Sequence, residues 1–211
     1  MRINKLFMEE KTDRIMQAVA GVLSEKGYQG ATITEIAAKA GVSRGLLHYY
    51  FKNKEEMLSR VIRHNMDGIF QNMQECFSGA SDADELADGL TSSMRAILEG
   101  DPQFFRLFLE SWTLSRQGPV AEELLKDIHT RFREAVSTGL LEMADRMAPG
   151  PDYRFDGLAA ILTALVDGLG MQMAIDVGLS GDEKVWKSCR EAIRGLVASH
   201  IPFGGKTWQP V

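Results

Sequence analysis

The sequence predicts an all-α protein of about nine helices, with an N-terminal three-helix helix-turn-helix domain and a C-terminal helical domain. Three observations predict this fold class. Apolar residues recur at helical spacing along most of the 211 residues. No stretch alternates polar and apolar residues over six or more positions, as half-buried strands do. The breaks between apolar runs carry glycine, proline and helix-capping residues.

The first two helices are bounded by capping residues. The first is predicted over residues 9–27, where one apolar stripe faces inward and Gly27 stands at the C-cap position. The second is predicted over residues 33–40. It begins after Thr32, which has capping-box spacing to Glu35.

A short third helix is predicted over residues 43–51. Gly41 breaks the chain before it, and Ser43 is its N-cap. Asn53 then caps a long fourth helix. The helix-turn-helix domain is therefore expected to cover residues 1–54.

The remainder of the chain reads as a second helical domain over residues 55–200. Proline and glycine separate its later helices, which are predicted at 83–99, 102–116, 119–147, 153–179 and 182–199. Residues 201–211 are rich in proline and glycine and are expected to form a flexible tail.

Charge is distributed unevenly between the two parts. The whole chain has a formal net charge of −5, but residues 1–60 carry +3 and residues 61–211 carry −8. Only the N-terminal part has the sign that suits a polyanion. The acidic remainder is expected to face away from nucleic acid.

Composition favours a soluble protein of the cytoplasm. Hydrophobic residues make up 45% of the chain, no run of 18 apolar residues predicts a membrane span, and the N-terminus lacks a signal-peptide pattern. Cys76 and Cys189 belong to no metal-binding motif and are expected to be reduced. No nucleotide-binding, metalloprotease or catalytic-triad motif occurs, so neither an enzyme nor a cofactor is expected.

The third helix has an apolar side and a polar side. On a helical wheel Leu46, Leu47 and Tyr50 fall together, and a helix this short must dock through them. The opposite side presents four residues: Arg44, Gly45, His48 and Tyr49. Arginine pairs with guanine and glycine permits close approach, so this side suits the major groove of DNA. Taken singly, Arg44 is more often a solvated surface residue, but the combined pattern in one basic segment favours DNA binding.

Residues beside the turn are expected to contact phosphate. Thr32 and Thr34 lie at the N-terminus of the second helix, whose N–H groups and dipole attract anions. Lys52 and Lys54 flank the start of the fourth helix, where their ammonium groups suit the next phosphate. A threonine at a helix start is usually only a cap, so this assignment also depends on the joint pattern.

Residues 14–58, RIMQAVAGVLSEKGYQGATITEIAAKAGVSRGLLHYYFKNKEEML, resemble the N-terminal domain of the TetR family of transcriptional regulators. The resemblance implies base contacts by Arg44, Gly45 and His48, and contacts to the DNA backbone by Thr32, Tyr49, Tyr50 and Lys54. His48 stands where the family commonly has tyrosine, which is a different hydrogen-bonding group. The full set expected to bind DNA is Thr32, Thr34, Ser43, Arg44, Gly45, His48, Tyr49, Tyr50, Lys52 and Lys54.

The same resemblance implies a C-terminal domain that dimerises and encloses an effector pocket. Helices 153–179 and 182–199, which combine small and apolar residues, are expected to form a four-helix interface in a homodimer. The alternative is that both are internal core of a monomer. A dimer would read a near-palindromic operator.

Pocket residues are predicted from composition. The segment FFRLFLESW (104–112) concentrates large apolar side chains, and methionine adapts to irregular cavities. The candidates are Phe105, Phe108, Trp112, Phe132 and Met171 as lining, with His129, Asp167 and Gln172 as polar anchors. Such aromatic and methionine residues are more often plain core, and a protein partner satisfies a buried polar group as readily as a ligand does.

The predicted function is sequence-specific DNA-binding regulation of transcription, by a repressor that a small, hydrophobic ligand releases from a palindromic operator. Activation instead of repression stays open. The expected partners are double-stranded operator DNA, a second copy of the chain and a small-molecule effector, with no membrane. The alternative is a small-molecule carrier with a vestigial helix-turn-helix, which would bind DNA weakly and without sequence preference.

Overall fold

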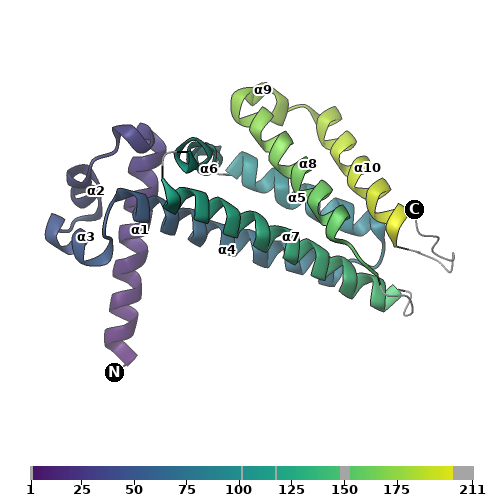
Figure 1. The fold of residues 1–211 in the computed structure, drawn as a ribbon, viewed down its shortest axis with the longest axis horizontal. Coiled ribbons are helices and arrows are strands. Elements are labelled where there is room, and N and C mark those ends of the chain that lie inside the picture. The colour runs from purple at the N-terminus through teal and green to yellow at the C-terminus, as the bar shows by residue number, and fades with distance from the viewer. Residues whose placement is uncertain (1, 101, 117, 148–152, 202–211) are drawn as a thin grey trace. The chain divides into compact units, whose positions relative to one another are not determined.

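The computed structural model describes residues 2–100, 102–116, 118–147 and 153–201. These ranges contain ten helices and no strand, which confirms the all-α prediction (Figure 1). The helices are α1 (Arg2–Gly30), α2 (Ile33–Ala40), α3 (Arg44–Tyr50), α4 (Lys54–Gly79), α5 (Ala83–Gly100), α6 (Pro102–Ser115), α7 (Pro119–Met147), α8 (Asp156–Ile175), α9 (Val177–Ser180) and α10 (Glu183–His200). The predicted flexible tail lies outside the described residues, apart from Ile201.

The largest differences from the predicted helix boundaries lie in α8 and α1. The helix predicted over 153–179 ends at Ile175, because the backbone of Asp176 leaves the helical region (φ −113, ψ 93). The Asp176 side chain then accepts a hydrogen bond from Gly178 N at 3.0 Å and starts the short helix α9. Helix α1 begins at Arg2 rather than at residue 9.

The predicted caps around the turn are confirmed. Thr32 and Glu35 form a reciprocal capping box, and Gly41 ends α2 in the left-handed conformation (φ 63, ψ 36). The hydroxyl of Ser43 accepts a hydrogen bond from Leu46 N at 3.2 Å, and Asn53 Oδ1 accepts one from Glu56 N at 2.8 Å. These caps satisfy N–H groups that a helix start leaves unpaired.

Contacts divide the chain into two compact units. Unit 1 contains residues 1–66 and 103–127, and unit 2 contains residues 67–102 and 128–211. Helix α6 and the first part of α7 therefore group with the helix-turn-helix. The predicted boundary after residue 54 follows local sequence signals and stays a prediction.

Apolar side chains of α1, α2 and α3 form the core of unit 1 and hold the helix-turn-helix in place. Leu23 of α1, Ile36 of α2 and Leu47 of α3 are each completely buried, and Phe51 directly after α3 is 2% exposed. Burying one such side chain contributes roughly 1.5–3 kcal/mol. The orientation of α3 is therefore fixed by its apolar side, as the wheel predicted.

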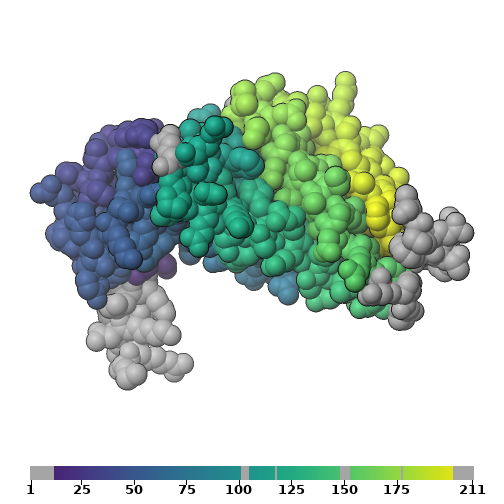
Figure 2. All heavy atoms as spheres, viewed as in Figure 1, coloured from purple at the N-terminus to yellow at the C-terminus, as the bar shows by residue number. Residues whose placement is uncertain are grey.

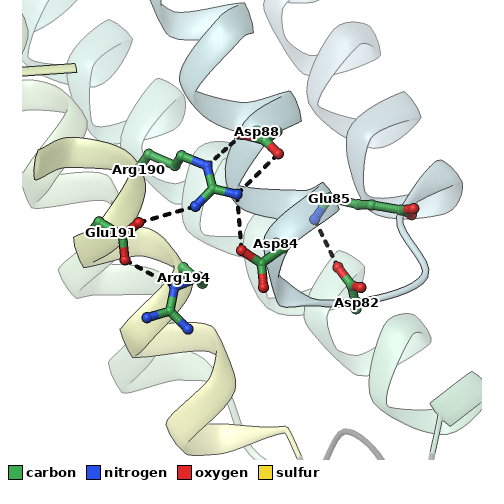
Figure 3. A network of polar contacts seen from close by, with 7 residues as sticks. All are labelled: Asp82, Asp84, Glu85, Asp88, Arg190, Glu191 and Arg194. Carbon is green, nitrogen blue, oxygen red and sulfur yellow. Dashed lines mark hydrogen bonds and ion pairs between the residues drawn. The ribbon is translucent and has the colours of Figure 1, made fainter. Parts of the chain in front are cut away.

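In unit 2, an arginine cluster joins α5 and α10. Arg190 of α10 lies between two carboxylates of α5, donating to Asp84 Oδ1 at 2.9 Å and to Asp88 Oδ1 at 2.5 Å (Figure 3). The guanidinium lowers the pKa of Asp88 below its usual value. Such exposed pairs contribute little stability each, about 0–1 kcal/mol, but their geometry fixes how α10 lies along α5.

Helix α8 presents an apolar face to solvent. Ile161 is 55% exposed, Met171 40% and Ile175 81%. By length and hydropathy alone, α8 would pass as a membrane span, although the sequence predicted no span; only a third of the 18-residue window is buried. One helix that meets these two criteria is weak evidence for a membrane span, because the mostly buried core helix of a soluble protein also meets them.

Candidate DNA-binding surface and ligand site

The exposed side of α3 carries the side chains predicted to read DNA. Leu47 is buried and Leu46 is half-buried, whereas Arg44, His48 and Tyr49 are exposed. Tyr49 is 80% exposed and meets the half-buried Tyr50 edge to face at 5.6 Å. A large aromatic side chain so exposed, on the same short helix as Arg44, suits contact with an external partner.

Gly45 leaves a shallow gap on the same side of α3. A Cβ atom built at this position would meet only Ser43 Oγ within 4 Å, at 3.9 Å. Internal packing therefore does not require glycine here, and the backbone of Gly45 is helical. The room that this glycine leaves is available to a partner approaching α3 from outside.

Of the two threonines at the start of α2, Thr32 forms side-chain hydrogen bonds within the capping box. Thr32 Oγ1 accepts from Glu35 N at 3.2 Å and donates to Glu35 Oε2 at 2.8 Å, so the capping box occupies it. These bonds and Lys26 lower the pKa of Glu35, with Lys26 as the larger cause. Thr34 is exposed, and its backbone lies in the first turn of α2.

The two lysines predicted to contact phosphate form different hydrogen bonds within the chain. Lys52 is exposed, and its backbone N–H donates to Glu56 Oε2 at 2.7 Å. Lys54 Nζ instead donates to the carbonyls of Tyr28 and Ala31, the latter at 3.0 Å, and lies 4.4 Å from the centre of the Tyr28 ring. The ammonium of Lys54 thus ties α4 to the end of α1, in addition to the phosphate contact that stays predicted.

The predicted pocket residues on α6 belong to unit 1. The rings of Phe105 and Phe108 lie 5.9 Å apart. Phe108 is 6% exposed, while Trp112 is 43% exposed. Helix α6 therefore presents a partly open aromatic face.

The predicted pocket residues on α7 and α8 belong to unit 2. His129 Nε2 lies 3.2 Å from Asp167 Oδ2, which joins α7 to α8, and the Phe132 ring packs against Phe70 at 6.0 Å. Met171 and Gln172 are exposed, and Gln172 Nε2 donates to Gly168 O at 3.2 Å. The polar anchors predicted at His129 and Asp167 thus pair with each other, and a role for any of these residues in ligand binding stays a prediction.

Sequence reasoning missed a groove of about 510 Å³ between α4 and α7 in unit 2. Phe70, Phe77 and Arg131 are among its lining residues. Gly139 of α7 lets Phe77 of α4 pack closely at this groove, since a Cβ there would lie 2.4 Å from Cγ of Phe77. The signal in the sequence was a glycine in the interior of a predicted helix.

A capped helix-turn-helix whose short third helix exposes arginine, histidine and tyrosine defines a DNA-binding regulatory protein. Comparison with family models supports the same class of protein. Residues 15–61 match the model for bacterial regulatory proteins of the tetR family, and residues 88–198 match the C-terminal model for BetI-type transcriptional repressors. The chain therefore belongs to the TetR family of transcriptional regulators, which bind DNA through the helix-turn-helix.

Individual relatives resemble the chain over most of its length. The transcriptional activator FasR of Mycolicibacterium smegmatis is 24% identical over 203 residues, covering 96% of this chain and 89% of FasR. The structure of FadR from Bacillus subtilis with stearoyl-CoA has a TM-score of 0.70 at 19% identity and covers 90% and 99% of the two chains. A regulator from Saccharomonospora viridis with choline has a TM-score of 0.65 at 23% identity and covers 90% and 96%.

Proposed function

We propose that the protein acts as a cytoplasmic homodimer that binds a near-palindromic operator and is released from it by a small apolar ligand. The observation that carries this proposal is the exposed side of α3, with Arg44 and His48 held outward by the buried Leu47. A single recognition helix binds weakly. Two copies related by a two-fold axis bring two such helices to successive major grooves.

The dimer is proposed through α8 and α10. The atoms of α8 lie beside those of α10 on the surface of unit 2 (Figure 2), and α8 exposes Ile161, Met171 and Ile175. A groove of about 550 Å³ between the two helices is lined by Leu165, Val185 and Cys189, among others. Exposed apolar patches of this kind mark interfaces, and a second copy would cover this one with the same patch.

The ligand is proposed to carry a long acyl chain. The partly open aromatic face of α6 favours an apolar ligand, and a neighbour of the same fold was solved with stearoyl-CoA. Aromatic side chains also bind quaternary ammonium groups, and another neighbour was solved with choline. Choline is therefore the second candidate.

Selection from genomic DNA identifies the operator. Genomic fragments retained by the purified protein are sequenced, and the shared motif is tested as a labelled duplex. We expect an inverted repeat that binds about 1,000-fold more tightly than random DNA. Arg44→Ala should abolish this preference, whereas Arg133→Ala, which removes the same charge from an exposed site on α7, should not.

Stearoyl-CoA and choline are then added to the protein–operator complex. Release by stearoyl-CoA alone supports the acyl ligand, and release by choline alone replaces it with a quaternary ammonium. Release by neither contradicts both ligand proposals. A reporter gene behind the operator decides between repression and activation, which the activator FasR makes a real alternative.

A further inference from the structure

The end of α1 is held by side chains from two other helices of unit 1. The backbone N–H of Tyr28 donates to Glu110 Oε2 of α6 at 2.6 Å. In the same segment, Lys54 of α4 donates to the carbonyls of Tyr28 and Ala31. The stretch from Tyr28 to Ala31 is thus held by a carboxylate at its first N–H and by an ammonium at the carbonyls of its first and last residues.

Gly27 creates the site for the carboxylate. Its backbone has φ 70 and ψ 170, which interrupts α1 immediately before Tyr28. A Cβ atom at this position would lie 2.7 Å from Glu110 Oε1, closer than side chains approach. The positive φ favours glycine at this position, and a Cβ there would make the Glu110 carboxylate shift from its present place.

The held segment leads directly into the helix-turn-helix. Ala31 is 2% exposed, and the next residue is Thr32, the N-cap of α2. Lys26, one position before Gly27, forms an ion pair with Glu35 in the first turn of α2. A shift of the end of α1 therefore moves the start of α2, on which α3 packs.

Glu110 lies on the same helix as the aromatic face proposed to meet the ligand. Phe105, Phe108 and Trp112 have the spacing of one helical face, and Glu110 is rotated from Phe108 by about 160° around α6. Helix α6 consequently presents aromatic rings on one side and the carboxylate on the other. In Figure 1, α6 lies beside the end of α1 that leads into α2.

We propose that Glu110 is the positioning residue through which α6 holds the α1–α2 junction, so that a displacement of α6 reaches the helix-turn-helix through this one carboxylate. The proposal rests on the proposed function and names how its DNA-binding surface is regulated. A charge-assisted hydrogen bond to a backbone N–H is stronger than a neutral one and depends steeply on position. Without it, Lys54 and the Lys26–Glu35 ion pair hold the junction less tightly, and DNA binding must then order the junction again.

The experiment compares four full-length proteins: wild type, Glu110→Ala, Glu110→Gln and the control Glu123→Ala. Glu123 is an exposed glutamate of α7 in the same unit, so its variant matches the change in net charge. Hydrogen exchange is measured at the Tyr28 amide, together with affinity for the selected operator and for a random duplex. Thermal melting shows whether each variant is folded.

In Glu110→Ala we expect the Tyr28 amide to exchange at least about tenfold faster, because its acceptor is gone. The operator Kd should rise about five- to tenfold, with the random-duplex Kd as in the control. Glu110→Gln should fall between, since its amide oxygen still accepts without charge. If Glu110 only stabilised the fold, the folded Glu110 variants would keep the wild-type ratio of operator affinity to random-duplex affinity.

Unchanged exchange at Tyr28 in both Glu110 variants would overturn the proposal. An operator-to-random ratio equal to that of Glu123→Ala would also overturn it. If wild type shows no operator preference, the proposed function fails, while the exchange measurement still decides whether Glu110 holds the junction.

Discussion

Replacing Ile175 by glutamate should separate the proposed dimer. Ile175 is 81% exposed in one copy of the chain, at the end of the apolar face of α8. Fully burying an isoleucine side chain is worth roughly 1.5–3 kcal/mol. If the second copy covers most of this side chain, its loss costs about 1–2.5 kcal/mol in each copy.

A two-fold interface contains the substituted residue twice, so the total is about 2–5 kcal/mol. Since about 1.4 kcal/mol is tenfold in an equilibrium constant, the dimer Kd should rise roughly 30- to 3,000-fold. A carboxylate placed within an apolar interface adds to this loss.

Sedimentation velocity over a range of protein concentrations measures the dimer Kd directly. The control is Val120→Glu, which introduces the same charge at a residue 37% exposed outside α8 and α10. A dimer Kd for Ile175→Glu within about fivefold of the control would refute the assignment of α8 to the interface. The operator preference of the variant should fall with the dimer.

Further predictions concern α3 and the cluster on α10. Gly45→Ala should raise the free energy of unfolding by about 0.5–1 kcal/mol, because alanine favours helix and a Cβ meets nothing closer than 3.9 Å. The same change should weaken operator binding by about tenfold if DNA approaches this gap; tighter or equal binding in an anisotropy titration would contradict that contact. Leu47→Ala should lower the free energy of unfolding by about 2–5 kcal/mol in urea titration, because the side chain is completely buried; a loss below about 1 kcal/mol would show that α3 is not anchored there. Arg190→Met should make the free energy of unfolding fall less as the pH is lowered. The pKa of Asp88 is lowered in the folded state, so its contribution is present above the unfolded pKa of about 4 and is lost as the pH falls through the folded value. Urea unfolding at about pH 6 and about pH 3 measures this, and an equal acid-induced loss in wild type and variant would exclude the pair as its source.

The features that could be predicted from the sequence depend on neighbours within a few positions. The capping box of Thr32 and Glu35, the break at Gly41 and the cap at Ser43 each join residues no more than a few positions apart. Their geometry follows from the local backbone and the side-chain type. The apolar and polar sides of α3 follow from helical periodicity in the same way.

The features that could not be predicted depend on contacts distant in sequence. Glu110 and Tyr28 are 82 positions apart, and nothing local in α6 indicates that its carboxylate meets a backbone N–H of α1. The sequence did not indicate that Lys54 ties α4 to the end of α1, because the carbonyls that it binds lie 23 and 26 positions earlier. Helix α9 was missed because the apolar pattern continues past Asp176, whose side chain nevertheless caps a new turn.

Sequence-specific reading of DNA by the exposed side of α3 is the property on which the other proposals depend. The most direct measurement is the ratio of affinities for the selected operator and a random duplex in one buffer, for wild type and Arg44→Ala. We expect a ratio of about 1,000 or more for wild type, with a collapse of the ratio in the variant. Equal affinity of the wild-type protein for both duplexes, or an unchanged ratio in Arg44→Ala, would contradict this reading of α3.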